Sequence, residues 1–252
     1  MKKTVLITGA TSGIGESCAR KFAAGGFNLI ITGRRKERLE TLAEELGSDS
    51  GVDILPLVFD VRSLSEVKSS LENMPSGWDK IDILINNAGL AVGLSHLQDG
   101  DTEDWERMID TNIKGLLWVT RTVSPGMAAR GSGHIINVAS IAGKEIYEYG
   151  NVYCATKHAV DALSRSMRID LLKTGVKVTN VAPGLVDTEF SLVRFKGDSK
   201  KADIPYKGLD PLTGDDVADV IYFCATTPAH VNINDIVVMP AAQGSANHYH
   251  RI

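Results

Sequence analysis

The 252-residue sequence predicts one α/β domain built around an open parallel sheet. Short apolar runs rich in β-branched residues alternate along the chain with segments of helical periodicity. The first apolar run leads into a glycine-rich turn and then a helix, which is the arrangement of a nucleotide-binding βα unit. The length also suits a single α/β domain with a large core.

Seven short runs have the composition of buried strands. They span residues 4–7, 28–32, 54–59, 81–85, 133–139, 176–181 and 236–239. One helix follows the glycine-rich turn, another runs through 155–171, and two more open at 101–105 and 213–217. We therefore expect one dinucleotide-binding domain over 1–252, with a substrate-covering lid at 185–210 and a polar C-terminal tail at 241–252.

Composition and charge narrow the functional classes. Hydrophobic residues make up 43% and charged residues 23% of the chain, as is usual for soluble globular proteins. The net charge of −4 argues against a broad nucleic-acid-binding surface. Met1–Ile7 resembles the start of a signal peptide, but its apolar run ends at Thr8–Gly9, and no run is long enough to span a membrane.

The cysteine and histidine spacings also bear on compartment and metal binding. Cys18, Cys154 and Cys224 lie far apart, which indicates neither a metal site nor a disulfide framework and fits a reducing compartment. We therefore expect a cytoplasmic protein without a bound metal. His248 and His250 could together bind a metal, but a mobile or partner-packed tail is the stronger expectation.

The turn after the first strand reads Thr8-Gly9-x-x-x-Gly13-x-Gly15. Glycines permit a tight turn and a close approach of the backbone to a pyrophosphate, and the helix N-terminus offers unpaired N–H groups to it. The alternative is a plain βα turn. The cofactor contacts expected here are Gly9, Thr11, Ser12, Gly13, Ile14 and Gly15.

The second strand ends at Gly33-Arg34-Arg35, where NAD-binding proteins carry a carboxylate for the ribose. Guanidinium groups bind a phosphate well, whereas a carboxylate would repel it, so Arg34 and Arg35 predict NADP rather than NAD. The two arginines also open a helix, where the macrodipole disfavours positive charge and a bound anion would compensate. A solvated helix start is the competing interpretation.

Further candidate cofactor contacts follow the third and fourth strands. Asp60-Val61 ends the third, and the Asp60 carboxylate either accepts a hydrogen bond from an adenine amino group or caps the following helix. Asn86-Asn87-Ala88-Gly89 follows the fourth. Its asparagines can tie neighbouring strand ends together, and Gly89 permits close approach to a ribose.

A candidate acid–base pair lies after the fifth strand. Ser140 ends that strand, and Tyr153 and Lys157 fall in the first turns of the next helix. Residues four apart share a helix face, so the Lys157 ammonium is expected beside the Tyr153 phenol. A nearby positive charge lowers the pKa of a phenol, which suits a general acid or base. Ser140 is expected to hydrogen-bond the same substrate oxygen. A Tyr-x-x-x-Lys spacing alone is equally common on surface helices.

Two more polar residues stand out near this pair. Asn112 lies among apolar residues of a helix, so it either satisfies local backbone groups or holds a water near Lys157. Arg194 is the single arginine of the 185–210 lid, and its guanidinium matches a substrate carboxylate. The alternative for Arg194 is a solvated ion pair with Asp198.

Together these residues resemble the short-chain dehydrogenase/reductase family. Its motifs stand in order as the glycine-rich turn, Asn86–Gly89, Ser140 and Tyr153-x-x-x-Lys157, and Asn112 fits as well. The resemblance covers essentially the whole chain. It implies a Rossmann-type, doubly wound sheet of seven strands with helices on both faces, a nicotinamide cofactor, a homotetramer, and catalysis by Asn112, Ser140, Tyr153 and Lys157.

The family pattern also extends the expected site. It adds Pro183, Gly184, Val186 and Thr188, together with Tyr153 and Lys157, to the cofactor contacts. It adds Tyr147 to the substrate contacts, which otherwise comprise Ser140, Tyr153 and Arg194.

A closer resemblance is to the NADP-dependent 3-hydroxy acid dehydrogenases. It rests on Gly33–Arg35, Asp104–Glu106, Gly150–Tyr153, Glu189–Asp198 and Pro228–Asn234. This subgroup acts on serine, allo-threonine and 3-hydroxyisobutyrate and reduces malonic semialdehyde. A 3-oxoacyl or general ketone reductase is the rival enzyme hypothesis. The rival from another class is a non-catalytic NADP sensor, for which Ser140, Tyr153 and Lys157 would be superfluous.

Overall fold

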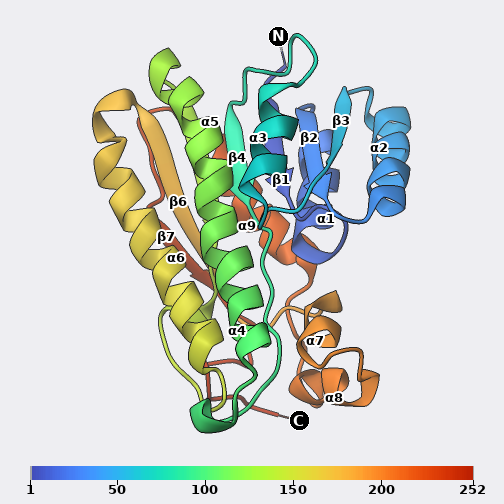
Figure 1. The fold of residues 1–252 in the computed structure, drawn as a ribbon, viewed down its shortest axis with the longest axis vertical. Helices are drawn as coiled ribbons and strands as arrows, with labels where there is room; N and C mark the ends of the chain where they lie inside the picture. Colours follow the sequence, from blue (N-terminus) through green and yellow to red (C-terminus); the bar gives the residue numbers. More distant parts are fainter. Residues whose placement is uncertain (1, 252) are drawn as a thin grey trace.

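The computed structural model describes residues 2–251, so Met1 and Ile252 of the expected 1–252 domain lie outside the described part. One parallel sheet of seven strands runs through it in the order β3-β2-β1-β4-β5-β6-β7 (Figure 1). The expected doubly wound sheet is confirmed. Its strands are β1 (Thr4–Thr8), β2 (Asn28–Gly33), β3 (Ile54–Val58), β4 (Ile83–Asn86), β5 (Gly133–Val138), β6 (Val176–Pro183) and β7 (Asp235–Val238).

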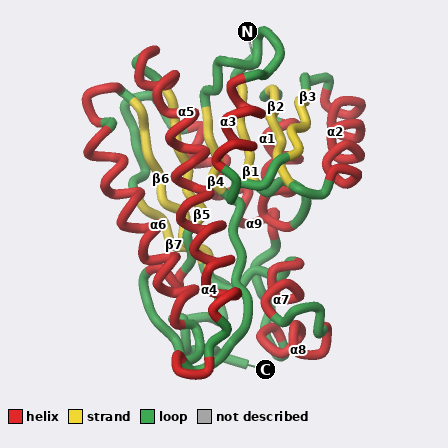
Figure 2. Tube along the Cα trace, viewed as in Figure 1, coloured by secondary structure: helices red, strands yellow, loops and turns green. Residues whose placement is uncertain are grey.

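Side chains of the central strands alternate between two separate cores. Val5 and Ile7 of β1 belong to one core, and Leu6 between them belongs to the other. The first core packs under α1 (Gly13–Ala24), α2 (Lys36–Ser50) and α9 (Gly214–Thr226). The second packs under α3 (Leu64–Glu72) and α5 (Leu116–Arg130), beside α6 (Asn151–Asp170). Helices therefore cover both faces of the sheet, as Figure 2 shows.

The helix expected to open at 101–105 does so, but it has three parts. Asp101 caps α4 (Thr102–Ile109) by accepting a hydrogen bond from the Glu103 N–H. A π-helical segment, Asp110–Gly115, follows and leads without a break into α5. Such π-bulges occur often at functional sites, and this one contains Asn112.

The lid has more regular structure than its sequence indicates. It contains α7 (Glu189–Arg194), α8 (Ser199–Asp203) and a 3₁₀ turn at Ile204–Tyr206, which project below the sheet in Figure 1. Short 3₁₀ turns also occur at Leu97–Asp99, Ile141–Gly143 and Leu172–Thr174. Helices this short have too few residues for a recognisable period.

The C-terminal tail makes hydrogen bonds to its own chain, and the expectation that it also packs on a partner stays a prediction. The Asn247 side chain donates to the Ile146 carbonyl, and the Arg251 guanidinium donates to the carbonyls of Pro205 and Lys207. The His248 ring bonds to the Ser245 hydroxyl. No cluster of metal-ligating side chains occurs within residues 2–251. No helix in that range is long and apolar enough to cross a membrane.

Candidate active site

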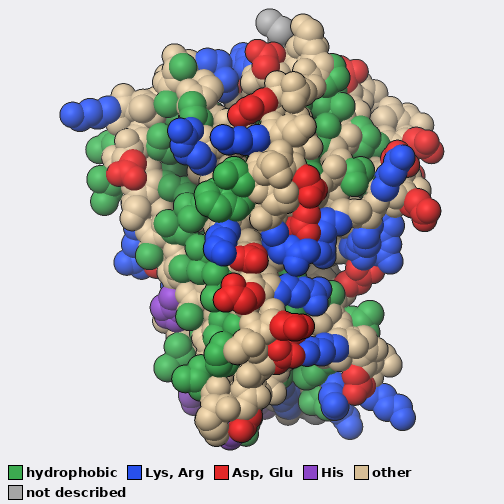
Figure 3. All heavy atoms as spheres, viewed as in Figure 1, with side chains coloured by type: hydrophobic (Ala, Val, Ile, Leu, Met, Phe, Trp, Pro, Cys, Tyr) green, Lys and Arg blue, Asp and Glu red, His purple; other side chains and the backbone are tan. Residues whose placement is uncertain are grey.

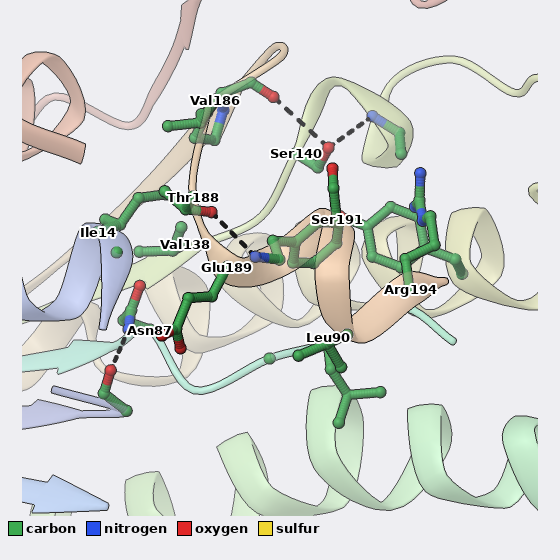
Figure 4. Close-up of a pocket in the computed structure, with 18 of the residues that line it drawn as sticks. Ile14, Asn87, Leu90, Val138, Ser140, Val186, Thr188, Glu189, Ser191 and Arg194 are labelled. Carbon is green, nitrogen blue, oxygen red and sulfur yellow. Dashed lines mark hydrogen bonds between the residues drawn. The ribbon is translucent and has the colours of Figure 1, made fainter. Parts of the chain in front are cut away.

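A cavity of about 660 Å³ lies at the carboxyl ends of the strands. Residues following β1, β2, β4, β5 and β6 line it, together with residues of α7 and the tail, and Figure 4 shows part of this lining. Of the site residues proposed from the sequence, all line this cavity except Gly15 and Asn112. This is where an open α/β sheet binds its ligand.

The glycine-rich turn is shaped by close backbone contacts. Gly9 and Gly13 have φ values of +70° and +54°, which side-chain-bearing residues adopt rarely. A Cβ atom on Gly15 would lie 2.2 Å from the Gly9 carbonyl oxygen. Asn87 reaches across from β4 and donates to the carbonyls of Thr8 and Gly9 (Figure 4). The expected tie between strand ends is therefore present, and it holds the turn open toward the cavity.

The arginines after β2 lie at one end of the cavity, where Figure 3 shows Lys and Arg side chains gathered between α2 and α7. Arg35 donates to the Ser12 hydroxyl at 2.7 Å and to the Glu189 carboxylate at 2.7 Å. Arg38 donates to the same carboxylate at 2.6 Å. Arg35 and Arg38 hold the pKa of Glu189 down at about 2. Within residues 2–251, the contact of the Arg34 guanidinium is with the Asp60 carboxylate, at 3.7 Å.

Asp60 does not cap the following helix. The N-cap of α3 is Ser63, whose hydroxyl accepts from the Glu66 N–H. The Asp60 carboxylate instead accepts hydrogen bonds from the backbone and guanidinium of Arg62. Burial opposes ionisation, but Arg62 and Arg34 still hold the pKa of Asp60 below its ordinary value. The carboxylate is thus already engaged by protein donors, and Val61 beside it lines the cavity.

Tyr153 and Lys157 lie in the first two turns of α6, as expected, and both are buried. Lys157 Nζ donates to the Val138 carbonyl at 2.9 Å. Burial lowers the pKa of Lys157 to about 8. Burial raises the pKa of Tyr153, against opposing effects of Arg194 and the Ser140 hydroxyl. Arg194 is the cation that opposes the effect of burial on the pKa of Tyr153 in this structure, and the lowering expected from Lys157 stays a prediction.

Ser140 begins the turn that joins β5 to α6. Its hydroxyl accepts from the Ala142 N–H at 3.1 Å and lies 3.5 Å from the Pro183 carbonyl oxygen (Figure 4). The first bond caps the 3₁₀ turn at Ile141–Gly143 and fixes the side chain. The Ser140 hydroxyl also lowers the pKa of Tyr153, and both residues line the cavity.

Asn112 lies behind the cavity wall in the π-helical segment. Its carbonyl oxygen accepts from the Leu90 N–H, and its amide donates to the Leu90 carbonyl and the Thr156 hydroxyl. These bonds join the π-helical segment to the backbone at Leu90, 22 residues away in sequence, and the expected water near Lys157 stays a prediction. A Cβ atom on Gly89 would lie 3.3 Å from Asn112 Oδ1 and 3.5 Å from Lys157 Nζ, so the bare glycine leaves both groups room.

Arg194 points into the site rather than toward solvent. Its guanidinium carbon lies 4.8 Å from the Tyr153 ring centroid and 5.2 Å from that of Phe190. It donates to the Tyr147 hydroxyl at 2.8 Å, and its buried Nε has no acceptor within the described chain. The alternative pair with Asp198 does not form, because Asp198 caps α8 and pairs with Lys201.

Some lining residues escape sequence reasoning. Glu189 and Phe190 stand in the segment that resembles the 3-hydroxy acid dehydrogenases, but their contacts depend on the position of α7. The tail contributes Gln243, Asn247 and Tyr249 to the cavity wall. No local pattern in the tail indicates this, because its path depends on contacts with residues far away in sequence.

Comparison with known proteins agrees with this geometry. Residues 3–197 match the family model described as short chain dehydrogenase. The NADP-dependent 3-hydroxy acid dehydrogenase YdfG of Escherichia coli K12 is 49% identical over 243 residues, 96% of each chain. Sulfoacetaldehyde reductase 2 of Chromohalobacter salexigens is 48% identical over 244 residues, again 96% of each chain. A closed form of serine dehydrogenase complexed with NADP+ superposes with a TM-score of 0.93 at 48% identity, covering 99% of this chain and 100% of the other.

Proposed function

Because the chain belongs to the short-chain dehydrogenase family, we propose that it is an NADP-dependent oxidoreductase acting on small 3-hydroxy acids. Hydride passes between C3 of the substrate and the nicotinamide. Serine, allo-threonine and 3-hydroxyisobutyrate are the alcohols expected as substrates, and malonic semialdehyde is the expected substrate for reduction. The observation that carries the substrate class is the Arg194 guanidinium, which lies beside Tyr153 without a carboxylate partner in residues 2–251.

The cavity suits a dinucleotide. The glycine turn is packed too closely to accept side chains at Gly9, Gly13 and Gly15, and α1 begins there without a side-chain cap from Ser12, so its first N–H groups suit a pyrophosphate. The arginine-rich end provides charge for a 2′-phosphate, since Arg34 and Arg35 replace the carboxylate typical of NAD sites. When bound, NADP+ supplies the hydride acceptor, and the protein supplies binding, orientation and proton transfer.

The chain's own groups support an acid–base mechanism. Tyr153 removes the proton of the substrate hydroxyl during oxidation and returns it during reduction. Ser140 orients the substrate oxygen toward Tyr153, and Asn112 holds the wall around Gly89 against Lys157. Lys157 would contact the nicotinamide ribose of a bound cofactor and, while charged, would favour the phenolate. Since burial raises the pKa of Tyr153 in this structure, oxidation depends on the cations that offset that burial.

Arg194 orients the substrate through its acidic end. A guanidinium can donate two parallel hydrogen bonds to a carboxylate, and Tyr147 holds one edge of this guanidinium at 2.8 Å. A small 3-hydroxy acid offers few other groups to hold, so this contact determines how C3 meets the nicotinamide. A sulfonate offers similar oxygens, and a relative is named sulfoacetaldehyde reductase, so sulfonated aldehydes are a second candidate substrate class.

The test is steady-state turnover with purified protein. Cofactor reduction is followed with serine, 3-hydroxyisobutyrate and an uncharged alcohol of similar size, each with NADP+ and with NAD+. The proposal expects the highest kcat/KM for an acid with NADP+. Equal kcat/KM for the uncharged alcohol would favour the general ketone reductase. Tight NADPH binding without turnover of any alcohol or aldehyde would indicate an NADP sensor.

We also propose that the protein is a cytoplasmic homotetramer. Large apolar side chains at the end of α6 and beyond it are exposed, with Ile169 at 75% and Leu172 at 73% exposure. Figure 3 shows apolar side chains over the α5 and α6 region of this face. Exposed apolar surface on a helical face is typical of subunit interfaces. The three free, buried cysteines suit a reducing compartment.

A further inference from the structure

The guanidinium of Arg35 is bound almost entirely by the protein itself. Its Nε and Nη2 donate to the Thr11 hydroxyl at 3.1 and 2.9 Å, and Nη2 also donates to the Ser12 hydroxyl at 2.7 Å. Its Nη1 donates to Glu189 at 2.7 Å. All three nitrogens of Arg35 therefore already have acceptors, in the glycine-rich turn and in the lid.

The neighbouring Arg34 is in a different situation. Its contact within the described chain is the ion pair with Asp60 at 3.7 Å, which is too long for a hydrogen bond. Arg62 already occupies that carboxylate with bonds as short as 2.6 Å. The Arg34 side chain is 53% exposed and lines the cavity, so its guanidinium is free to take an anion.

From this difference we infer that Arg35 is a positioning residue that joins the glycine-rich turn to the lid through Glu189, and that Arg34 alone selects the cofactor phosphate. The inference rests on the proposed NADP dependence and divides its two arginines by task. A phosphate on Arg35 would compete with four acceptor atoms, namely the Thr11 hydroxyl and carbonyl, the Ser12 hydroxyl and the Glu189 carboxylate, whereas a phosphate on Arg34 displaces only a weak contact.

The contact between Arg35 and Glu189 also affects the substrate end of the site. Glu189 is the first residue of α7 and Arg194 is the last, so one short helix connects the two ends of the cavity. Beyond Arg194, Lys196 pairs with Asp104 at 2.8 Å. Loss of the Arg35–Glu189 contact leaves Glu189 bound to Arg38 of α2 but no longer tied to the glycine-rich turn. We expect this loss to loosen the first turn of α7 and to let Arg194 shift relative to Tyr153.

The experiment compares Arg34→Gln, Arg35→Gln and Glu189→Gln with the wild-type protein. Arg20→Gln is the matched control, because Arg20 also bridges two carboxylates but lies outside the cavity. Dissociation constants for NADPH and NADH come from fluorescence titration. KM and kcat are measured with a 3-hydroxy acid. Tryptic cleavage of the NADPH-bound proteins reports lid mobility, since the lid contains several lysines.

Arg34→Gln should reduce the NADPH preference over NADH about tenfold or more. Arg35→Gln should leave that preference within about twofold of wild type while weakening the binding of both NADPH and NADH. It should also raise the KM for the acid and speed cleavage of the lid. Glu189→Gln should raise the KM for the acid and speed cleavage of the lid without changing the preference for NADPH over NADH. In the double variant Arg35→Gln/Glu189→Gln, the increases in KM and in cleavage rate should be smaller than the sum of those in the two single variants. Arg20→Gln should resemble the wild type.

Two outcomes would overturn the inference. One is a loss of NADPH preference in Arg35→Gln as large as in Arg34→Gln. The other, which remains available if Arg35→Gln does not fold, is a Glu189→Gln variant with wild-type KM and lid cleavage. The proposed function is tested by a different result. Wild-type protein that shows no preference for NADPH over NADH would contradict the cofactor assignment, whatever the variants show.

Discussion

At the scale of single residues, the site combines a buried phenol with two cationic residues in different surroundings. The Arg194 guanidinium carbon lies 4.8 Å from the centroid of the Tyr153 ring. Lys157, one turn along α6, has its pKa lowered by burial to about 8. The charge that Lys157 offers to a phenolate therefore decreases as the pH rises through about 8.

Replacing Tyr153 with Phe should reduce kcat on the order of a thousandfold or more, because it removes the group that transfers the proton. The ring and its packing against Phe190 remain, so NADPH binding should be retained. Steady-state assays measure kcat, and fluorescence titration measures the affinity for NADPH. Tyr222→Phe is the control, since its hydroxyl lies beside Gly25, away from the cavity. Substantial residual kcat in Tyr153→Phe would assign the proton transfer to another group.

Lys157 should make stability depend on pH in a defined direction. Its pKa is about 8 when folded and 10.5 when unfolded, so between these values the unfolded chain binds more protons and folding becomes more favourable as pH rises. This contribution is complete above pH 10.5 and is lost as pH falls through 8. From pH 7.5 to 9.5, wild type should gain on the order of 2 kcal/mol over Lys157→Met.

Urea unfolding of the two cofactor-free proteins across that range measures the difference. A constant gap between them would mean that Lys157 titrates normally in the folded protein. The same result would show that burial does not lower the pKa of Lys157.

The sequence predicts the catalytic residues well because their spacing is local. Ser140 follows a strand, and Tyr153 and Lys157 are one helical turn apart, so secondary structure alone brings them to one edge of the sheet. The partner of Arg194 could not be predicted in that way. Whether the guanidinium meets Asp198 or Tyr153 depends on how α7 docks, which is a matter of tertiary contacts.

At the scale of elements, the junction between β1 and α1 has the least tolerance for change. Gly15→Ala would bring a Cβ atom to 2.2 Å from a backbone oxygen. Overpacking of this kind costs about 1–3 kcal/mol or more, and here it would also distort the turn that meets the cofactor. Gly47→Ala in α2 has open space around it and should be neutral or stabilising by up to about 1 kcal/mol.

Denaturant unfolding of both glycine variants, with NADPH titration of each, measures this contrast. Gly15→Ala should lose stability and NADPH affinity together. If Gly15→Ala binds NADPH as tightly as Gly47→Ala does, the close backbone approach at the turn is not required for the cofactor.

The elements that the sequence predicts least well are those stabilised by distant partners. Apolar periodicity and helix caps such as Asp101 predict the strands and the long helices. The lid helices have five or six residues each, too few for a period, and the tail has no periodicity at all. Asp60 illustrates the same limit, since its position fits either an adenine contact or a helix cap, but Arg62, two residues on, binds its carboxylate.

At the scale of the whole molecule, the alternation of strands and helices determines the doubly wound sheet. Both faces of the central strands are buried, so apolar side chains appear at consecutive positions such as Val5, Leu6 and Ile7. Assembly cannot be derived from a single chain in the same way. The sequence does not reveal which apolar residues remain exposed after folding, such as Ile169 and Leu172.

A homotetramer predicts that these exposed residues lie at subunit contacts. Leu172→Glu should shift the assembly toward smaller species, because a buried unpaired carboxylate strongly disfavours association. Sedimentation velocity at micromolar concentration measures the change, with Lys173→Glu as a neighbouring control. A monomeric wild type would contradict the assembly. If the tetramer is unaffected by Leu172→Glu, the subunit interface lies on another face of the protein.

We propose that Arg194 makes this family member a dehydrogenase of acids. The decisive experiment compares kcat/KM of Arg194→Ala on a 3-hydroxy acid and on an uncharged alcohol of the same size. Arg194→Ala should lose on the order of 2–4 kcal/mol in kcat/KM for the acid and keep nearly unchanged activity on the uncharged alcohol. Equal losses on both substrates, or no loss on either, would show that Arg194 does not bind the substrate carboxylate.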